Sequence, residues 1–269
     1  MLRSPPACPD PTGVYTDLAA PDLEQLDGFD AVIHLAGETI AQRWTRRRRE
    51  SILASRAVFT TKLCAALART KRPPAHFLSA SGAHYYGYWR EEPLTEESST
   101  GEGFLAEVCR QWEAASSVLE PTTRVVHMRT AAVLARDGGA LAKLLTPFKL
   151  GMGAVMGSGR QVMSWIALAD VLGAIDHGLR TPALRGPVNF ASPNPVTNRQ
   201  FTKTLAKVLH RPAILRVPAA VVKMGFGQMA VETILANQNM VPAKLLATGY
   251  TFVHPTLDDA LRAVLQSND

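Results

Sequence analysis

The chain has 269 residues, of which 46% are hydrophobic and 19% charged, and its formal net charge is +6 at pH 7. These values are typical of a soluble globular protein that is long enough to bury a large core. The three cysteines form no C-x-x-C pair, which indicates neither a disulfide framework nor a zinc site and favours a reducing, cytoplasmic location. No apolar run approaches the roughly 20 residues of a membrane span, so no membrane association is expected.

The positive charge is densest at Arg46–Arg49. Glu50 follows directly, and a mixed run of this kind is usually a solvated helix face. Nucleic-acid binding would require basic residues interleaved with stacking aromatics, and only Trp44 is near. We therefore expect no nucleic-acid partner.

Strand and helix patterns alternate along the first half of the chain. A buried strand is predicted at 30–38, and Thr45 is a suitable N-cap for a helix that reaches about Thr70. The elements predicted next are a strand at 77–81, a polar loop at 88–103, a helix at 104–119 and a strand at 124–128. This alternation predicts an α/β protein with a Rossmann-like parallel sheet and helices on both faces.

The pattern loosens after Gly138, where we place a domain boundary. Residues 1–137 would form an incomplete dinucleotide-binding domain, and residues 138–269 a smaller substrate-side and mainly helical region, partly interleaved with the sheet. The elements predicted in this second region are a helix at 140–148, a glycine-rich loop at 151–161, a strand and helix at 165–179 with Asp170 as N-cap, a strand at 188–191, mainly helices from about Asn198, and a final helix at 257–265.

The segment before the first predicted strand lacks a cofactor cradle. Dinucleotide-binding domains open with a strand, a glycine-rich turn and a helix whose N-terminus holds the pyrophosphate. No G-x-G-x-x-G or G-x-x-G-x-x-G pattern lies upstream of Asp30, and the 29 residues before it contain five prolines. We expect either that the cradle has been lost or that the sequence starts late, as an N-terminally truncated form.

Ten blocks of sequence occur together in one order. They are Asp30–Glu38, Arg43-Trp44-Thr45, Ser55-Arg56-x-x-x-Thr60, Ser79-Ala80-Ser81, Tyr85-Tyr86-Gly87, Trp112-Glu113, Arg129-Thr130, Pro147-Phe148-x-Leu150-Gly151, Gly157-Ser158-Gly159-x-Gln161 and Trp165-Ile166. This set resembles the atypical extended short-chain dehydrogenase/reductase proteins called the epimerase family protein group. The resemblance covers about Asp30 to Leu265 and implies an NADP(H) cofactor and a helical C-terminal region of unknown function.

Dehydrogenases of this fold use a tyrosine whose pKa is lowered by a lysine four residues later. None of the five tyrosines has a lysine at that spacing. With Glu113 as the anchor of the comparison, the two positions fall on Leu105 and Cys109, which cannot perform this proton transfer. The resembled family shares the loss.

Three residues remain as candidates for catalysis. Ser81 ends a strand where this fold keeps a substrate-polarising hydroxyl, and Tyr85 or Tyr86 could supply a proton from the loop that follows. Each has a structural alternative, which is a hydroxyl that caps the turn for Ser81 and a packing aromatic for each tyrosine.

The resemblance implies cofactor contacts from Ala36, Gly37 and Ser79, and from Arg3 at the end of a lost second strand. Arg56 falls where related epimerases carry an asparagine that faces the cofactor. Its guanidinium could clamp a phosphate or carboxylate, or it could form a surface ion pair with Glu50 or a neighbouring residue.

For the substrate, the resemblance implies contacts from Arg160, Gln161 and Trp165. Sugar-nucleotide epimerases place a phosphate-binding arginine at the position of Met163 and a histidine at that of Ala167, so a nucleotide sugar is less expected. The sequence predicts an NADP(H)-dependent oxidoreductase or epimerase acting on a small carbonyl or sugar-like compound, with no metal. The alternatives are a nucleotide-sensing protein without turnover, working through a protein partner or as a homodimer, and an inactive truncated form.

Overall fold

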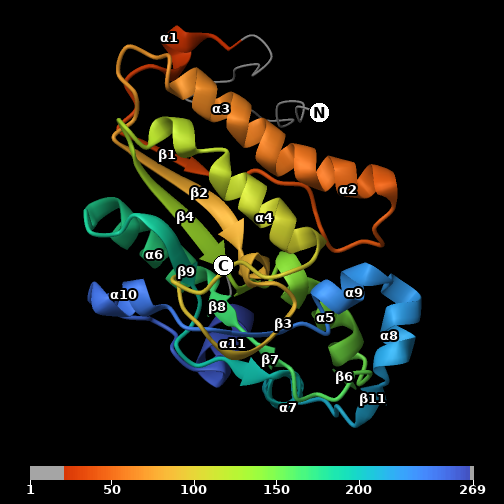
Figure 1. Ribbon diagram of the computed structural model, residues 1–269. Helices are drawn as coiled ribbons and strands as arrows, with labels where there is room; N and C mark the ends of the chain where they lie inside the picture. Colours follow the sequence, from red (N-terminus) through yellow and green to blue (C-terminus); the bar gives the residue numbers. More distant parts are fainter. Residues whose placement is uncertain (1–20, 267–269) are drawn as a thin grey trace.

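The computed structural model describes residues 21–266 of the chain. At its centre lies a four-stranded sheet with the strand order β1-β2-β4-β9, in which every neighbouring pair is parallel. The strands are β1 (Ala31–His34), β2 (His76–Gly82), β4 (Arg124–Thr130) and β9 (Gly186–Phe190). The predicted α/β fold with a parallel sheet is confirmed, and β9 joins the sheet although it follows the predicted boundary at 138 (Figure 1).

Helices cover both faces of this sheet, as parallel sheets require (Figure 1). On one face Phe77 packs in a cluster with Leu67 of α3 (Phe59–Leu67). On the other face Leu78 packs in a cluster with Ile175 of α6 (Leu168–Arg180). Since successive side chains of a strand point to opposite faces, the continuous apolar run of β2 fills both layers.

The first long helix contains a change of helical type. It consists of α2 (Arg46–Leu53), a π-helical turn η1 (Ala54–Val58) and α3, which ends at Leu67 and not near Thr70. The predicted N-cap is confirmed, because the Thr45 side chain accepts a hydrogen bond of 3.2 Å from the backbone N–H of Arg48. The π-helical turn carries Arg56, and such turns are frequent at functional sites.

The segment 88–103, predicted to be a loop, contains a strand. In this segment β3 (Trp89–Leu94) pairs in parallel with β12 (Asn237–Met240). The local sequence Trp-Arg-Glu-Glu-Pro-Leu has no alternation that would indicate a strand. Its partner comes from the other end of the chain, so the tertiary pairing overrides local propensity here.

Two helix ends also differ from the prediction. Helix α4 (Phe104–Ala114) ends before a separate 3₁₀ turn at Ser117–Leu119. The N-cap of α6 is Ala167, and Asp170 lies in the first turn. The Asp170 carboxylate is fully buried and accepts hydrogen bonds from the backbone N–H of Val253 (2.6 Å) and of His254 (3.0 Å), so it joins the C-terminal segment to α6.

The other elements are short strands that pair in twos and helices that pack around them. The strand pairs are β5 (Ala132–Leu134) with β8 (Trp165–Ala167), β6 (Ala154–Met156) with β11 (Leu215–Val217), and β7 (Val162–Met163) with β10 (Val196–Thr197). The helices are α1 (Leu23–Leu26), α5 (Gly139–Lys149), α7 (Asn198–Val208), α8 (Ala219–Phe226), α9 (Gln228–Glu232), α10 (Ala243–Ala247) and α11 (Leu257–Gln266). The mainly helical character predicted from about Asn198 is confirmed, with β11 and β12 as additions.

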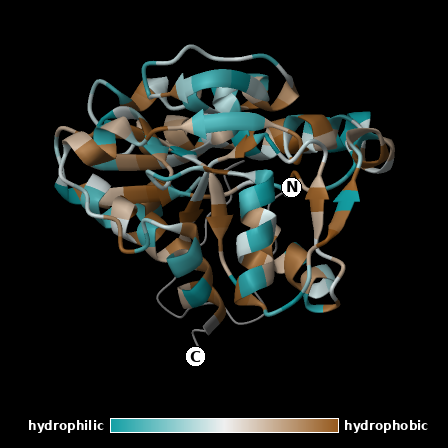
Figure 2. Ribbon diagram, turned by 90° about the horizontal axis from the view of Figure 1, so that it is seen from below, coloured by the Kyte–Doolittle hydropathy of each residue, from teal (hydrophilic) through white to brown (hydrophobic). Residues whose placement is uncertain are grey.

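Hydrophobic residues are concentrated on the central strands, while the helices alternate between hydrophilic and hydrophobic turns (Figure 2). No helix within residues 21–266 is long and apolar enough to cross a membrane. Within the same residues β1 pairs with β2 on one side only. Ile33 and Leu35 are 43% and 62% exposed, so β1 is an edge strand that carries apolar side chains on the surface.

Candidate active site

The carboxyl ends of the four parallel strands meet at one edge of the sheet, which is where open α/β sheets bind ligands. The register places Ser81 of β2 beside Arg129 of β4, and Arg129 beside Asn189 of β9. Residues paired in register point to the same face of a sheet. Three neighbouring strands therefore present a row of polar side chains at this edge.

Arg129 is the centre of the polar row and is only 3% exposed. Its guanidinium donates to both carboxylate oxygens of Glu113 on α4, at 2.9 and 2.8 Å. Burial alone would lower the pKa of Arg129, but the hydrogen bonds and charge of Glu113 raise it above its ordinary value. The pair is therefore a charged, bidentate contact between the sheet and α4.

Ser81 is attached to the same carboxylate. Its hydroxyl donates a 2.7 Å hydrogen bond to Oε1 of Glu113, and the residue is 6% exposed. A serine that polarises a carbonyl must donate a hydrogen bond to the carbonyl oxygen. In this arrangement the Ser81 hydroxyl would have to break its hydrogen bond to Glu113 before it could donate one to a substrate. Its oxygen can still accept a hydrogen bond.

The two adjacent tyrosines differ in what their hydroxyls contact. Tyr86 is fully buried, donates to Oδ1 of Asn189 at 2.7 Å and accepts from Nη1 of Arg129 at 3.1 Å. Burial raises the pKa of Tyr86 to about 12. The Tyr85 ring lies 3.4 Å from Cζ of Arg129, and its hydroxyl has no hydrogen-bond partner within residues 21–266. Of the two, Tyr85 has the hydroxyl that is free to exchange a proton with a ligand.

The helix that would carry the tyrosine and lysine of other dehydrogenases carries no acid or base at those positions. Leu105 is buried in a cluster with Ile52 and Val108. Cys109 lies beside the end of β2, and a Cβ on Gly82 would be 3.6 Å from its Sγ. Burial raises the pKa of the Cys109 thiol to about 12, so it stays neutral.

The residues expected to contact the cofactor divide into a surface group and a buried one. Ala36 and Gly37 are exposed in the loop that follows β1. Ser79 is 1% exposed, and its hydroxyl donates to its own neighbour, the carbonyl of Ala80, at 3.3 Å. Arg3 lies outside the described residues.

Arg56 supports the loop after β1. Its Nη2 donates to the carbonyl of Glu38 at 2.9 Å, and its guanidinium lies over the ring of Trp112 at 5.1 Å. A Cβ on Gly37 would lie 3.0 Å from Cζ of Arg56, so the loop and the guanidinium are closely packed. The ion pair with Glu50 that was the alternative for Arg56 is not formed, since Glu50 accepts from Arg46 at 3.0 Å.

The residues expected to contact the substrate mostly serve the fold. Trp165 is fully buried, packs in the cluster of α5, α7 and α11, and donates its indole N–H to the carbonyl of Asn194 at 2.9 Å. Gln161 is 4% exposed and donates to the carbonyl of Met156 at 3.0 Å, which closes the glycine-rich turn. Arg160 is exposed on that turn.

The sequence did not predict the ion pair between Glu113 and Arg129. It gave no indication that Glu232 contacts α4. Both Glu113 and Arg129 belong to quoted motifs, which was the only signal available for them. Glu232 lies in α9, yet its carboxylate accepts from the backbone N–H of Phe104 (3.1 Å) and of Leu105 (2.8 Å) at the start of α4. The N-cap of α4 is Gly103, which has no side chain to offer, so a distant carboxylate supplies the cap.

A parallel sheet covered by helices on both faces, with a polar cluster at the carboxyl ends of its strands, is the architecture of Rossmann-like α/β proteins. Residues 5–190 match the model of the NAD dependent epimerase/dehydratase family, and residues 217–264 match a domain of unknown function, DUF1731. The chain belongs to the NAD dependent epimerase/dehydratase family. The atypical short-chain dehydrogenase/reductase relationship expected from the motifs is thereby confirmed.

Its relatives carry the name epimerase family protein. The chain is 39% identical to Epimerase family protein Mb2239 of Mycobacterium bovis over 242 residues, which cover 89% of this chain and 80% of that protein. It is 34% identical to Epimerase family protein SDR39U1 of Homo sapiens over 255 residues, which cover 93% and 86%. The crystal structure of human SDR39U1 (isoform2) with NADPH superimposes with a TM-score of 0.85 at 33% identity, covering 90% of this chain and 83% of that one.

More distant structures agree in fold alone. UDP-glucuronic acid 4-epimerase from Bacillus cereus, in complex with UDP-glucuronic acid and NAD, matches with a TM-score of 0.74 at 16% identity. That match covers 93% of this chain and 79% of the epimerase. The Rossmann-like architecture is therefore shared well beyond the close relatives.

Proposed function

We propose that the protein is an NADP(H)-dependent oxidoreductase or epimerase that acts on a small carbonyl or sugar-like compound. The observation that carries the proposal is the Ser81–Glu113–Arg129 cluster at the carboxyl end of β2 and β4, with the ring of Tyr85 stacked on Arg129. A polarising hydroxyl and a proton donor are the two groups that hydride transfer to or from a carbonyl requires.

The described residues fit one wall of a dinucleotide site. Leu35, Ala36 and Gly37 form an exposed, mostly apolar loop at the carboxyl end of β1, and Arg56 holds this loop from behind. A nicotinamide cofactor lying along the strand ends would cover these residues and would supply the hydride. The glycine-rich turn that cradles a pyrophosphate is not among residues 21–266. The NADPH in the human relative's structure supports NADP(H) as the ligand of this wall.

Within the site the chain's own residues have separable tasks. Ser81 would donate a hydrogen bond to a substrate oxygen after release from Glu113, without giving up its proton. Tyr85 would give a proton to the substrate oxygen in reduction and take it back in oxidation. Its ring is held by stacking on Arg129, and its hydroxyl has no hydrogen-bond partner among the described residues that would compete with a ligand. Glu113 and Arg129 would keep Ser81 and Tyr85 oriented through the bidentate contact.

The experiment has two stages and uses the whole chain. NADPH affinity is first measured by titrating cofactor fluorescence. Turnover is then followed across a panel of small aldehydes, ketones and keto-sugars, as NADPH oxidation for a reductase and as formation of the epimer for an epimerase, which returns its hydride. Ser81→Ala and Tyr85→Phe are expected to keep the NADPH affinity and lose turnover. Ser117→Ala, an exposed serine in the 3₁₀ turn, is the matched control and should keep both. Absence of NADPH binding by the wild-type chain would contradict the proposal.

A second candidate function is nucleotide sensing without turnover, acting through a protein partner or a second copy of the chain. It is supported by the state of the site itself, in which the Ser81 proton is held by Glu113 and the Tyr86 hydroxyl is fully engaged. This candidate predicts NADPH binding with neither NADPH oxidation nor formation of an epimer for any compound in the panel. Turnover that Ser81→Ala abolishes would exclude it.

A further inference from the structure

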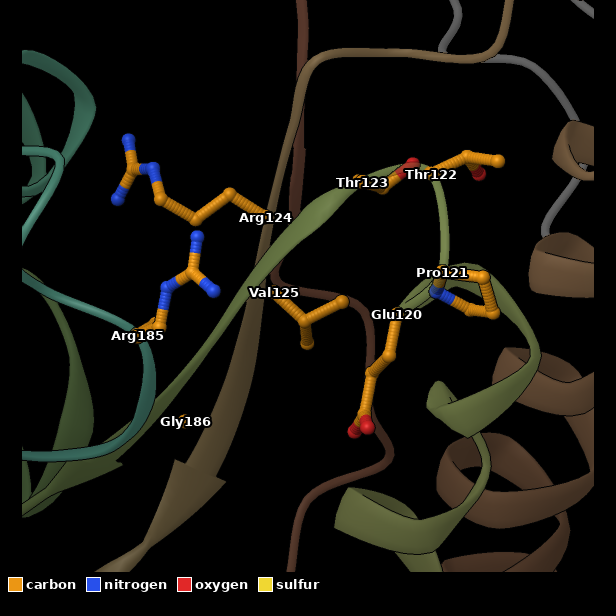
Figure 3. A pocket seen from close by; sticks show the side chains of 8 residues that line it. All are labelled: Glu120, Pro121, Thr122, Thr123, Arg124, Val125, Arg185 and Gly186. Atoms are coloured by element: carbon orange, nitrogen blue, oxygen red, sulfur yellow. The ribbon is translucent and has the colours of Figure 1, made fainter.

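A polar cavity lies at the end of the sheet opposite the Ser81 edge, where β4 and β9 begin (Figure 3). Its volume is about 560 Å³, which is enough for a small metabolite. Two arginines line it, Arg124 at the start of β4 and Arg185 directly before β9. β4 spans seven residues, so this cavity is about 20 Å from the Ser81 edge at the usual rise per residue.

Arg124 is a built-in, buried cation. It is 9% exposed, and its Nη1 and Nη2 donate to the carbonyls of Leu184 (2.7 Å) and Leu179 (2.9 Å). These two contacts fix the plane of the guanidinium. Its Nε–H is buried and has no hydrogen-bond partner. Because this N–H does not open to the cavity, Arg124 acts on a ligand there through the charge of its guanidinium.

Arg185 adds a second charge on the same side. Figure 3 shows the guanidinium groups of Arg124 and Arg185 on one side of β4, with the Glu120 side chain across the strand from them. No acidic side chain within residues 21–266 forms an ion pair with either arginine. The charge of Arg185 opposes that of Arg124 and, after burial, is the second cause that lowers the pKa of Arg124. Glu120 also lines the cavity, but its carboxylate forms no ion pair with either arginine, so both guanidinium groups are available to a bound anion.

We propose that this cavity, defined by Arg124 and Arg185, binds a phosphate group, either as the free ion or as the phosphate of a small monoester. A tetrahedral dianion in the cavity can accept from the fork of Arg185 beside the Arg124 guanidinium, and it removes the repulsion between the two cations. The site is separate from the proposed cofactor edge and does not depend on any activity there.

The test is a titration of the protein with inorganic phosphate and, in parallel, with glycerol 3-phosphate, at constant ionic strength and followed by calorimetry. Arg185→Ala is expected to weaken binding by roughly tenfold or more, since it removes a charge-assisted donor pair. Arg47→Ala removes the same charge from the exposed face of α2 and should leave the affinity unchanged. Arg124→Lys keeps the charge but loses the planar group that the Leu184 and Leu179 carbonyls hold in place, and it should also weaken binding.

The outcomes separate the two sources of phosphate and the competing explanation. Tighter binding of the monoester than of free phosphate indicates a phosphorylated metabolite, and the reverse order indicates the ion itself. Equal losses for Arg185→Ala and Arg47→Ala, or equal binding of sulfate and chloride, would show non-specific attraction to a basic protein and would overturn the proposal. No binding of either ligand by the wild-type chain would overturn it as well.

Discussion

The carboxylate of Glu232 accepts a 2.8 Å hydrogen bond from the backbone N–H of Leu105, across 127 residues of sequence. Glu232 accepts a second hydrogen bond from the backbone N–H of Phe104. The C-terminal region therefore caps α4, the helix that carries Glu113. The orientation of the polar cluster at the Ser81 edge is therefore linked to a residue of the DUF1731 segment.

Removing the cap should destabilise the protein. Glu232→Ala leaves two N-terminal backbone donors of α4 without a buried acceptor, and we expect a loss of about 1–2 kcal/mol in the free energy of unfolding. Urea denaturation measures the change. Glu97→Ala, which removes an exposed carboxylate, should alter stability little. Equal effects of the two variants would show that the cap contributes nothing.

Breaking the Glu113–Arg129 pair should be more costly. Arg129→Met leaves the Glu113 carboxylate buried without its bidentate partner, and such losses are about 3–5 kcal/mol. The double variant Glu113→Gln with Arg129→Met should recover part of the loss, because no isolated charge remains. Glu50→Gln breaks the exposed pair with Arg46 and is the control, with little expected change. A double variant no more stable than Arg129→Met would contradict the account.

His34 should make stability depend on pH. Burial lowers its pKa from 6.5 to about 4, and its Nε2 lies 2.7 Å from the Thr60 hydroxyl. As pH falls through 6.5 the unfolded chain takes up a proton that the folded chain does not, so the unfolded state is favoured. The contribution of His34 to the free energy of unfolding is thus fully present above pH 6.5. It falls by on the order of 3 kcal/mol as the pH decreases towards 4.

Chemical denaturation between pH 7 and pH 4.5 tests this dependence. His34→Gln, which cannot titrate, should be less stable than the wild type at pH 7, and the gap should narrow as the pH falls. His210→Asn is the control, since His210 is exposed and asparagine tolerates its φ of 53°. If the free energies of unfolding of the wild type and of His34→Gln changed equally with pH, His34 would be excluded as the cause of the pH dependence.

Arg56 should affect cofactor affinity through the loop that it supports. Arg56→Lys keeps the charge but loses the planar group that bonds to the Glu38 carbonyl and lies over Trp112. We expect NADPH to bind several-fold more weakly, with little change in the melting temperature. Arg47→Lys is the matched control. Unchanged affinity in Arg56→Lys would separate this loop from the cofactor site.

Local sequence signals were sufficient to predict the parallel α/β architecture. They were also sufficient to predict that the tyrosine–lysine pair of other dehydrogenases is absent. Apolar runs such as Phe77–Leu78 identify parallel strands because a strand covered on both faces needs apolar residues at every position. The helix cap at Thr45 is likewise a local signal, since the side chain bonds to a backbone N–H three residues on. The absence of a tyrosine–lysine pair at Leu105 and Cys109 was also visible without any structure.

The assembly of the site, in contrast, depends on tertiary packing. Glu113 and Arg129 form their ion pair because α4 packs on the sheet. The sequence around each residue contains no pattern that predicts which residue it contacts. The same holds for β3 and β12, and for Glu232 at the start of α4. Short-range signals depend on neighbours within a few residues, whereas these contacts join groups far apart in sequence. Their geometry is set by the packing of the whole chain and not by any one segment.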